Sequence, residues 1–186
     1  GMSMGGWFRH ELHSLQGLQG LRFRMPGLGG DLYQPFGIMQ VSLPPGETLP
    51  ALQSGAIDAA EFAGPFSDLA LGFYHAAPYY YGPGLHEPNG TGECIVNRRI
   101  FDALPADLQA IVSEACRAEN AYALAEAERM NAEALASLLY EHGVQLRRFP
   151  PDIVEALRRQ SPAVLGQFAG GGLAGRIHDS YAAMLA

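Results

Sequence analysis

Arg24 is the side chain best suited to bind an anion, because it ends the apolar segment Leu21–Met25 and is followed closely by Pro26-Gly27. The segment predicts a strand that the proline and glycine terminate. Side chains at strand ends face the crevice where α/β sheets bind ligands, and a guanidinium fork matches a carboxylate. Arg24 is therefore a candidate carboxylate anchor, while a solvent-exposed arginine fits the spacing as well.

Glu61, which is followed by Phe62, and His86, which follows an aromatic run, are further candidates for a binding site. Glu61 lies in a predicted apolar strand, Ile57–Ala63. Because burial of a charge is costly, its carboxylate must be paired, bound to a metal or protonated, unless it faces solvent. His86 and Glu87 follow the aromatic run Tyr79–Tyr81. Because no second His or Cys stands at zinc-ligand spacing, we do not expect zinc.

The sequence lacks the signatures of common enzyme classes: it has no GxSxG elbow, no P-loop and no dinucleotide fingerprint. The glycine-rich turn 27–30 follows a strand as a phosphate-binding turn would, but it lacks the Lys-Ser/Thr ending. No pair of residues makes a persuasive general acid and base. These observations favour a binding protein over an enzyme.

Short strands and short helices alternate through the first hundred residues and must position these side chains. Helices are predicted at Asp31–Phe36, closed by Gly37, and at Thr48–Ser54, closed by Gly55. The further predicted strands are Ile38–Leu43, Tyr79–Tyr81 and Glu93–Asn97. This alternation is typical of a mostly parallel sheet covered by helices.

A very long helix is predicted from Pro105 to His142, with Gly143 just past its last turn. About 38 residues would span roughly 57 Å, which exceeds the ~26 Å diameter of a 100-residue domain. Such a helix is expected to bridge two lobes or two subunits. A strand, Val144–Phe149, and a helix, Pro151–Gln160, follow it; the glycines 170–172 then precede a tail helix, Leu173–Leu185. We therefore divide the chain into an α/β lobe (1–104), a spanning helix (105–142) and a C-terminal part (143–186).

The composition of the 186 residues is that of a chain with a core, since 48% are apolar and 17% charged. Twelve basic against nineteen acidic residues give a net charge of −7, which disfavours a nucleic-acid partner. No apolar run approaches the ~20 residues of a membrane helix, and residues 1–11 lack the basic and apolar parts of a signal peptide. Cys94 and Cys116 are expected to be buried thiols, with a disulfide left open by their spacing.

Four segments, in order along the chain, resemble motifs of the TRAP-transporter substrate-binding proteins. Their family motifs are G-L-K-x-R-x-P, A-L-Q-x-G-x-I-D-A, E-W-x-G-P and Y-Y-Y-x-P-G-W-H-E-P. The matching segments here are Gly20–Gly30, Leu49–Ala59, Glu61–Pro65 and Tyr79–Pro88. The last two are similar to the subgroup that binds 2-oxo acids and related monocarboxylates, such as pyruvate or lactate.

The resemblance implies an α/β fold of the periplasmic-binding-protein type, here incomplete, with a very long interlobe helix and a C-terminal helical tail. It also implies a periplasmic location, cooperation with transporter membrane subunits, no enzymatic activity and no organic cofactor. Some members form homodimers by exchanging the C-terminal helix. A homodimer is therefore expected here, and the C-terminal part (143–186) is the segment that such a dimer could exchange.

The resemblance also assigns site residues. Arg24 would hold the substrate carboxylate in a bidentate pair. Glu61, Glu87 and the backbone carbonyl of Phe62 would bind a Na⁺ or Ca²⁺ ion that bridges to the substrate, as hard cations prefer oxygen ligands. The apolar wall is assigned to the side chains of Trp7, Phe62 and Tyr80.

The chain departs from the family pattern in three ways. The family's chains are nearly twice as long, so the resemblance covers only their C-terminal part. Ser3 stands where the family has a glutamine metal ligand, and Phe62 replaces the usual tryptophan. One alternative is therefore a truncated remnant that self-associates through an exposed helix and binds no ligand. A lyase or isomerase acting on oxo acids is a further alternative without an acid–base pair to support it.

Overall fold

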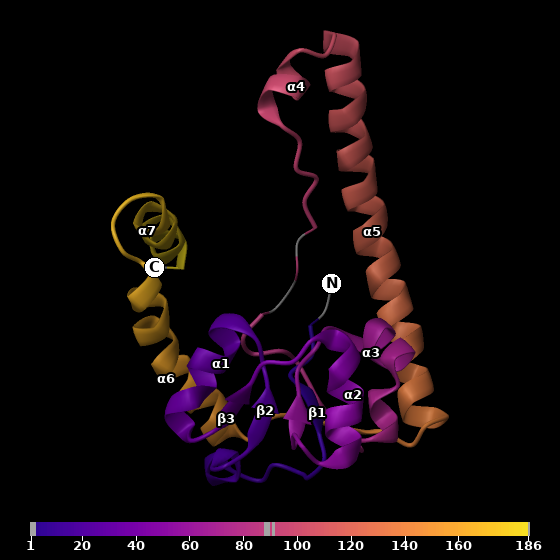
Figure 1. The fold of residues 1–186 in the computed structure, drawn as a ribbon, viewed down its shortest axis with the longest axis vertical. Coiled ribbons are helices and arrows are strands. Elements are labelled where there is room, and N and C mark those ends of the chain that lie inside the picture. Colours follow the sequence, from indigo (N-terminus) through magenta and orange to yellow (C-terminus); the bar gives the residue numbers. More distant parts are fainter. Residues whose placement is uncertain (1–2, 88–89, 91, 186) are drawn as a thin grey trace.

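The computed structural model describes residues 3–87, 90 and 92–185. The described residues form a lobe around a six-stranded sheet, from which the long helix α5 (Ala106–Tyr140) extends (Figure 1). The strand order is β3-β2-β4-β1-β5-β6. The pairs β2·β3, β2·β4 and β5·β6 are parallel, whereas β1 runs antiparallel to β4 and β5. The strands are β1 (Gly6–Phe8), β2 (Arg22–Arg24), β3 (Met39–Val41), β4 (Ala59–Ala60), β5 (Tyr79–Tyr81) and β6 (Gln145–Arg147).

Helices cover both faces of this sheet. On one face, α1 (Gly27–Tyr33) and α6 (Pro151–Phe168) pack against an apolar cluster that includes Phe8 and Tyr81. On the other, α2 (Pro45–Ser54), α3 (Pro65–Leu71) and the C-terminal end of α5 pack against a cluster that includes Trp7 and Tyr80. Consecutive strand residues point to opposite faces. The neighbours Trp7 and Phe8 on β1, and Tyr80 and Tyr81 on β5, therefore each place one ring in each of the two clusters. The expected mostly parallel α/β fold is confirmed.

Strand β1 was not predicted from the sequence, and two glycines allow it to lie at the centre of the sheet. Gly6 has φ +121°, and a Cβ on Gly6 would lie 2.7 Å from the carbonyl oxygen of Ala60 on β4. A Cβ on Gly5 would overlap the ring of Phe149. The backbone of β1 therefore approaches its neighbours more closely than any side chain allows.

Several predicted boundaries are confirmed. The glycines 37, 55 and 143 all have positive φ and follow the elements they were predicted to end. Helix α5 has 35 residues and is roughly 52 Å long. Helix α7 occupies Leu173–Leu185, as predicted. The remaining elements are the short helix α4 (Arg98–Asp102) and the 3-10 turns η1 (Leu15–Leu18), η2 (Gln34–Phe36) and η3 (Phe73–His75). Neither α5 nor any other helix in the described part of the chain is long and apolar enough to cross a membrane.

Four local predictions were wrong. The segment Glu93–Asn97 is not a strand: it is exposed and leads away from the sheet to α4, so it has no strand to pair with (Figure 1). Cys94 and Cys116 are exposed rather than buried. Helix α1 begins at Gly27, directly after Pro26, and not at Asp31.

The fourth error concerns α6, which continues past Gln160 to Phe168 although Pro162 lies inside it. Proline removes a helical hydrogen bond and usually ends a helix. Here Pro162 is exposed, so water can solvate the carbonyl that loses its partner, and Val164 beyond it is buried in the core. Burial of Val164 favours continuing the helix over ending it at the proline.

Gly6→Ala is expected to lower the free energy of unfolding by roughly 3 kcal/mol or more, because it adds a clash with β4 to an unfavourable φ. Gly20→Ala is the matched control: Gly20 also has positive φ, +73°, but nothing lies within 4 Å of its Cβ position. The control should lose only about 1 kcal/mol. Urea denaturation followed by the fluorescence of Trp7 measures both, and equal losses would contradict the packing of β1.

Candidate functional site

The parallel pairing of β2 with β4 places Arg24 beside Glu61. Arg24 lies opposite Ala60 in the register, and the Glu61 amide donates to the Arg24 carbonyl at 2.9 Å. The Arg24 Nη1 donates to the carbonyl of Glu61 at 2.5 Å, and Nε donates to the carbonyl of Leu43 at 3.4 Å. The guanidinium is thus fixed mainly by backbone oxygens at the carboxyl ends of two neighbouring strands.

Both charges of this pair are largely withdrawn from water. Arg24 is 8% exposed and Glu61 4%, and Nη1 lies 3.7 Å from the Glu61 Oε2. Burial lowers the pKa of Arg24 and the Glu61 carboxylate opposes this, but an arginine stays charged throughout the physiological range. The Phe62 ring lies 5.3 Å from the guanidinium carbon. Within the described residues Nη2 makes no hydrogen bond, which leaves one edge of the fork for a ligand.

His86 is the second neighbour of Glu61. Its Nε2 lies 3.4 Å from the Glu61 Oε1, and its side chain is 5% exposed. Neither ring nitrogen of His86 nor the hydroxyl of Tyr33 has a hydrogen-bond partner of good geometry among the described residues. Burial, and after it the charge of Glu61, raises the pKa of Tyr33. Buried polar groups rarely lack partners, so the surroundings of Glu61 are suited to a further polar ligand.

Trp7 and Tyr80 form a buried brace with Asp68. Their rings stack with centroids 4.0 Å apart, and both donate to the Asp68 Oδ2, at 2.9 Å from the indole and 2.7 Å from the phenol. Burial raises the pKa of Asp68 to about 6, and the two hydrogen bonds oppose that rise. All three side chains are inaccessible to solvent. Their arrangement is that of a core support, and the assignment of Trp7 and Tyr80 to a ligand-facing wall stays a prediction.

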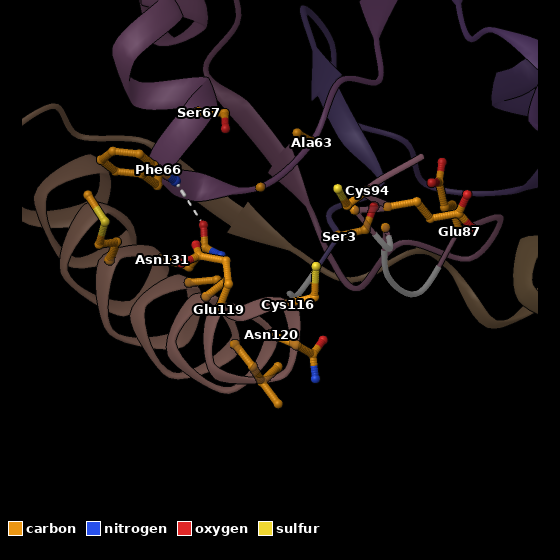
Figure 2. Close-up of a pocket in the computed structure, with 18 of the residues that line it drawn as sticks. Ser3, Ala63, Phe66, Ser67, Glu87, Cys94, Cys116, Glu119, Asn120 and Asn131 are labelled. Carbon is orange, nitrogen blue, oxygen red and sulfur yellow. Dashed lines mark hydrogen bonds between the residues drawn. The ribbon is translucent and has the colours of Figure 1, made fainter. Parts of the chain in front are cut away.

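A pocket of about 1120 Å³ lies between this edge of the lobe and α5 (Figure 2). Ser3, Phe62 and Glu87 contribute to its lobe side, while Cys116, Glu119 and Asn120 come from α5. The Phe66 amide donates to the Asn131 Oδ1 at 3.0 Å and closes one end. Arg24, Glu61, Trp7 and Tyr80 are not among its lining residues. The predicted site residues therefore fall into three neighbouring groups: the arginine pair, the buried brace and the pocket wall.

The oxygen donors expected to bind a cation lie on adjoining segments. The His86–Glu61 contact places the residue before Glu87 against the Glu61 side chain, and Phe62 and Glu87 share the pocket. Two carboxylates and a carbonyl suit a hard cation such as Na⁺ or Ca²⁺. Within the described residues no three His, Cys, Asp or Glu side chains gather around one point. The oxygen donors of Glu61, Glu87 and Phe62 are thus of the kind that a Na⁺ or Ca²⁺ ion prefers. A bound solute or water would supply the remaining ligands.

Two residues of this region were missed by the sequence prediction. Asp68 stands alone as a charge in the apolar stretch of α3, which was the available signal for a buried, hydrogen-bonded carboxylate. His86 was considered only as a zinc ligand, whereas its partner in the structure is Glu61.

Comparison with known proteins identifies the family. The model of bacterial extracellular solute-binding protein, family 7, matches residues 1–170. The chain belongs to this family. Solved structures that match the chain are TRAP periplasmic solute-binding proteins, and both the family and these neighbours are transport proteins and not enzymes. The resemblance inferred from the four sequence segments is therefore confirmed.

Three similar proteins indicate what such family 7 members bind. A monocarboxylate 2-oxoacid-binding periplasmic protein from Nostoc sp. is 40% identical over 161 residues, which are 87% of this chain and 44% of that protein. A TRAP solute-binding protein from Colwellia psychrerythraea with bound calcium and pyruvate is 35% identical, with TM-score 0.84, over 97% of this chain and 55% of that one. A TRAP solute-binding protein from Pseudoalteromonas atlantica with bound sodium and pyruvate is 34% identical, with TM-score 0.74. This match covers 91% of this chain and 51% of that one. The chain spans about half the length of these relatives.

The stability of this family 7 chain is expected to depend on pH through Asp68. Its pKa is about 6 in the folded protein against 3.8 ordinarily, so the folded state holds the proton more tightly than the unfolded state. The resulting contribution, roughly 3 kcal/mol, is complete below about pH 4 and is lost as the pH rises through 6. Asp68→Asn should flatten this part of the profile, as measured by urea denaturation between pH 4 and 7. A variant profile that falls as steeply as the parent's would show that Asp68 does not titrate in this way.

Proposed function

We propose that this chain carries the carboxylate-anchoring part of an extracytoplasmic solute-binding subunit of a TRAP-type transporter, and that its ligand is a small monocarboxylate. A 2-oxo acid such as pyruvate, or lactate, is the class of ligand. The observation on which the proposal rests is the buried guanidinium of Arg24, which backbone carbonyls hold while its Nη2 makes no hydrogen bond within the described residues. A buried guanidinium with a free donor edge is suited to a bidentate pair with a carboxylate.

The surroundings of Arg24 favour an ion pair with a ligand. Phe62 covers one side of the guanidinium, and the low exposure of Arg24 limits screening by water. A carboxylate in this place gains more from the pair than at a solvent-exposed arginine. In this proposal the ligand carboxylate binds the free edge of Arg24, and Glu61 is drawn from the arginine toward a cation.

A bound Na⁺ or Ca²⁺ ion would supply a positive centre that bridges the ligand oxygens and the protein carboxylates. Glu61, Glu87 and the Phe62 carbonyl would hold it, and Ser3, at the same wall of the pocket, would replace the glutamine of the family pattern. The calcium and sodium in the pyruvate-bound relatives support this part of the proposal.

We also propose a periplasmic location and membrane transporter subunits as partners, by analogy with the curated relative and the family. A homodimer is proposed from α7, whose large apolar side chains are exposed: Leu173, Ile177, Tyr181 and Met184. Their i, i+4, i+8, i+11 spacing puts them on one face of the helix. Exposed stripes of this kind are usually buried by association, and a second copy of the chain offers the same stripe.

Isothermal titration tests ligand capture. With Ca²⁺ present, the folded chain is expected to bind pyruvate, and Arg24→Lys should weaken binding at least about tenfold, because lysine keeps the charge but loses the fork. Arg22→Lys is the matched control on the same strand. The Arg22 Nη2 donates to the Asp58 Oδ1 at 2.6 Å, at the ends of β2 and β4 opposite to Arg24 and Glu61, and its replacement should leave the affinity unchanged.

Removal of Ca²⁺ and Na⁺ by a chelator and dialysis should weaken pyruvate binding in the same assay. Glu87→Gln should also weaken pyruvate binding, because it removes a charged ligand of the cation. A chain that is folded by circular dichroism and binds neither pyruvate nor another 2-oxo acid overturns the proposal. In that case a self-associating chain without ligand would be the better description.

Light scattering over a range of concentrations tests the dimer. Tyr181→Asp is expected to raise the dissociation constant at least about tenfold, because it places a charge in the buried stripe. Ala182→Asp adds the same charge on another face of α7 and should have little effect. A chain that stays monomeric throughout, or two variants that behave alike, would argue against association through α7.

A further inference from the structure

The two cysteines of the chain, Cys94 and Cys116, lie next to each other at the pocket between the lobe and α5. Both are exposed and in the thiol form. Figure 2 shows the two side chains at the same part of the pocket, Cys94 on the segment that leads to α4 and Cys116 on α5. Desolvation, and after it the charge of the neighbouring Cys94, raises the pKa of the Cys116 thiol. They are thus a pair and not two isolated thiols.

The geometry of the chain explains why they meet. Residues 92–97 form an irregular segment that leads away from the lobe to α4, after which the chain turns and returns down α5 (Figure 1). Cys94 lies 98 − 94 = 4 residues before the start of α4, a distance of about 13 Å in extended chain. Cys116 lies 116 − 106 = 10 residues after the start of α5, about 15 Å along a helix. The segment 92–97 and the N-terminal part of α5 thus both pass the pocket, which the two cysteines line.

We propose that Cys94 and Cys116 form an intramolecular disulfide that fastens the segment 92–97 to α5. The oxidant is a small disulfide such as oxidised glutathione. A cysteine thiolate attacks one of its sulfurs and releases the first glutathione thiolate. The second cysteine thiolate then attacks the protein sulfur of the mixed disulfide and releases the other. Two protein thiols and one small disulfide thus yield one protein disulfide and two glutathione thiols, which take up the two protons.

The bond would have a structural role because this end of the molecule has little packing of its own. The buried residues of α5, Ala134 and Leu138, both lie near its C-terminal end, and the segment 92–97 is exposed. A covalent link below the turn restricts the loop that includes α4. The curated relative is a periplasmic protein, and disulfides form and persist in the periplasm.

Incubation of the full chain in glutathione buffers, followed by thiol titration and a non-reducing peptide map, tests the bond. We expect both thiols to disappear together, and the peptides that contain Cys94 and Cys116 to be joined within one chain. Ala118→Cys combined with Cys116→Ser moves the thiol to the opposite face of α5. This variant should be at least about tenfold less oxidised at the same glutathione ratio. Thiols that stay free, bonds formed only between chains, or equal oxidation of the displaced thiol would each overturn the proposal.

Trypsin tests the fastening. Arg98 and Arg99 lie in α4, within the loop that the bond closes. Oxidation is expected to slow cleavage after them by about tenfold, since cleavage requires local opening. Cys94→Ser, which cannot form the bond, should be cleaved at the same rate in both buffers. Unchanged cleavage of a fully oxidised parent chain would show that the bond does not restrain the loop.

Discussion

The parallel pairing of β2 with β4 is the constraint on which the candidate site depends. The register sets Arg24 opposite Ala60. The residue after Ala60, Glu61, therefore lies beside the Arg24 side chain at the end of both strands. A slip of one residue would turn Arg24 to the other face of the sheet and separate the two charges. Because β1 runs antiparallel, its starting end, with Ser3, comes to the same edge as the last residues of β5. The two-residue strand β4 thus lies between β2 and β1, and the sheet brings Arg24, Glu61, Ser3 and the end of β5 to one edge.

Beneath this edge, the brace formed by Trp7, Tyr80 and Asp68 joins β1, β5 and α3. A buried carboxylate is costly unless it is hydrogen-bonded, and here two donors from two strands converge on one oxygen. The brace fixes α3 relative to the sheet, and the short connection between β4 and α3 contains Phe62. The position of the Phe62 ring near Arg24 is therefore supported by a polar contact on the same face of the sheet, where Phe62 packs against the cluster that contains Trp7 and Tyr80. The buried residues Trp7, Tyr80 and Asp68 thus help to determine the position of Phe62, which lies at the pocket.

Sequence reasoning was most successful where the signal is local. The ends of α2 and α5 were placed by Gly55 and Gly143, which adopt the positive φ that glycine alone takes without strain. It failed where tertiary packing decides. The apolar run Cys94-Ile95-Val96 has the composition of a strand, but no neighbouring strand lies near it. Gly6-Trp7-Phe8 is too short to show alternation, yet it lies in the centre of the sheet. Among the candidate site residues, Arg24 and Glu61 were singled out by their places in predicted strands, and the family resemblance gave them roles. The contact of Glu61 with His86 required the fold.

Helix α5 has the mechanical properties of a lever. Its C-terminal end is clamped in the lobe by Ala134 and Leu138, while the rest of its roughly 52 Å length has no buried residue. A rotation of one degree about the clamped end displaces the far end by about 0.9 Å over that length. A movement of α3, which packs against α5, would therefore be amplified toward the far end of the helix. A sub-ångström adjustment beside Phe62 would be transmitted to the tip as a displacement several times larger.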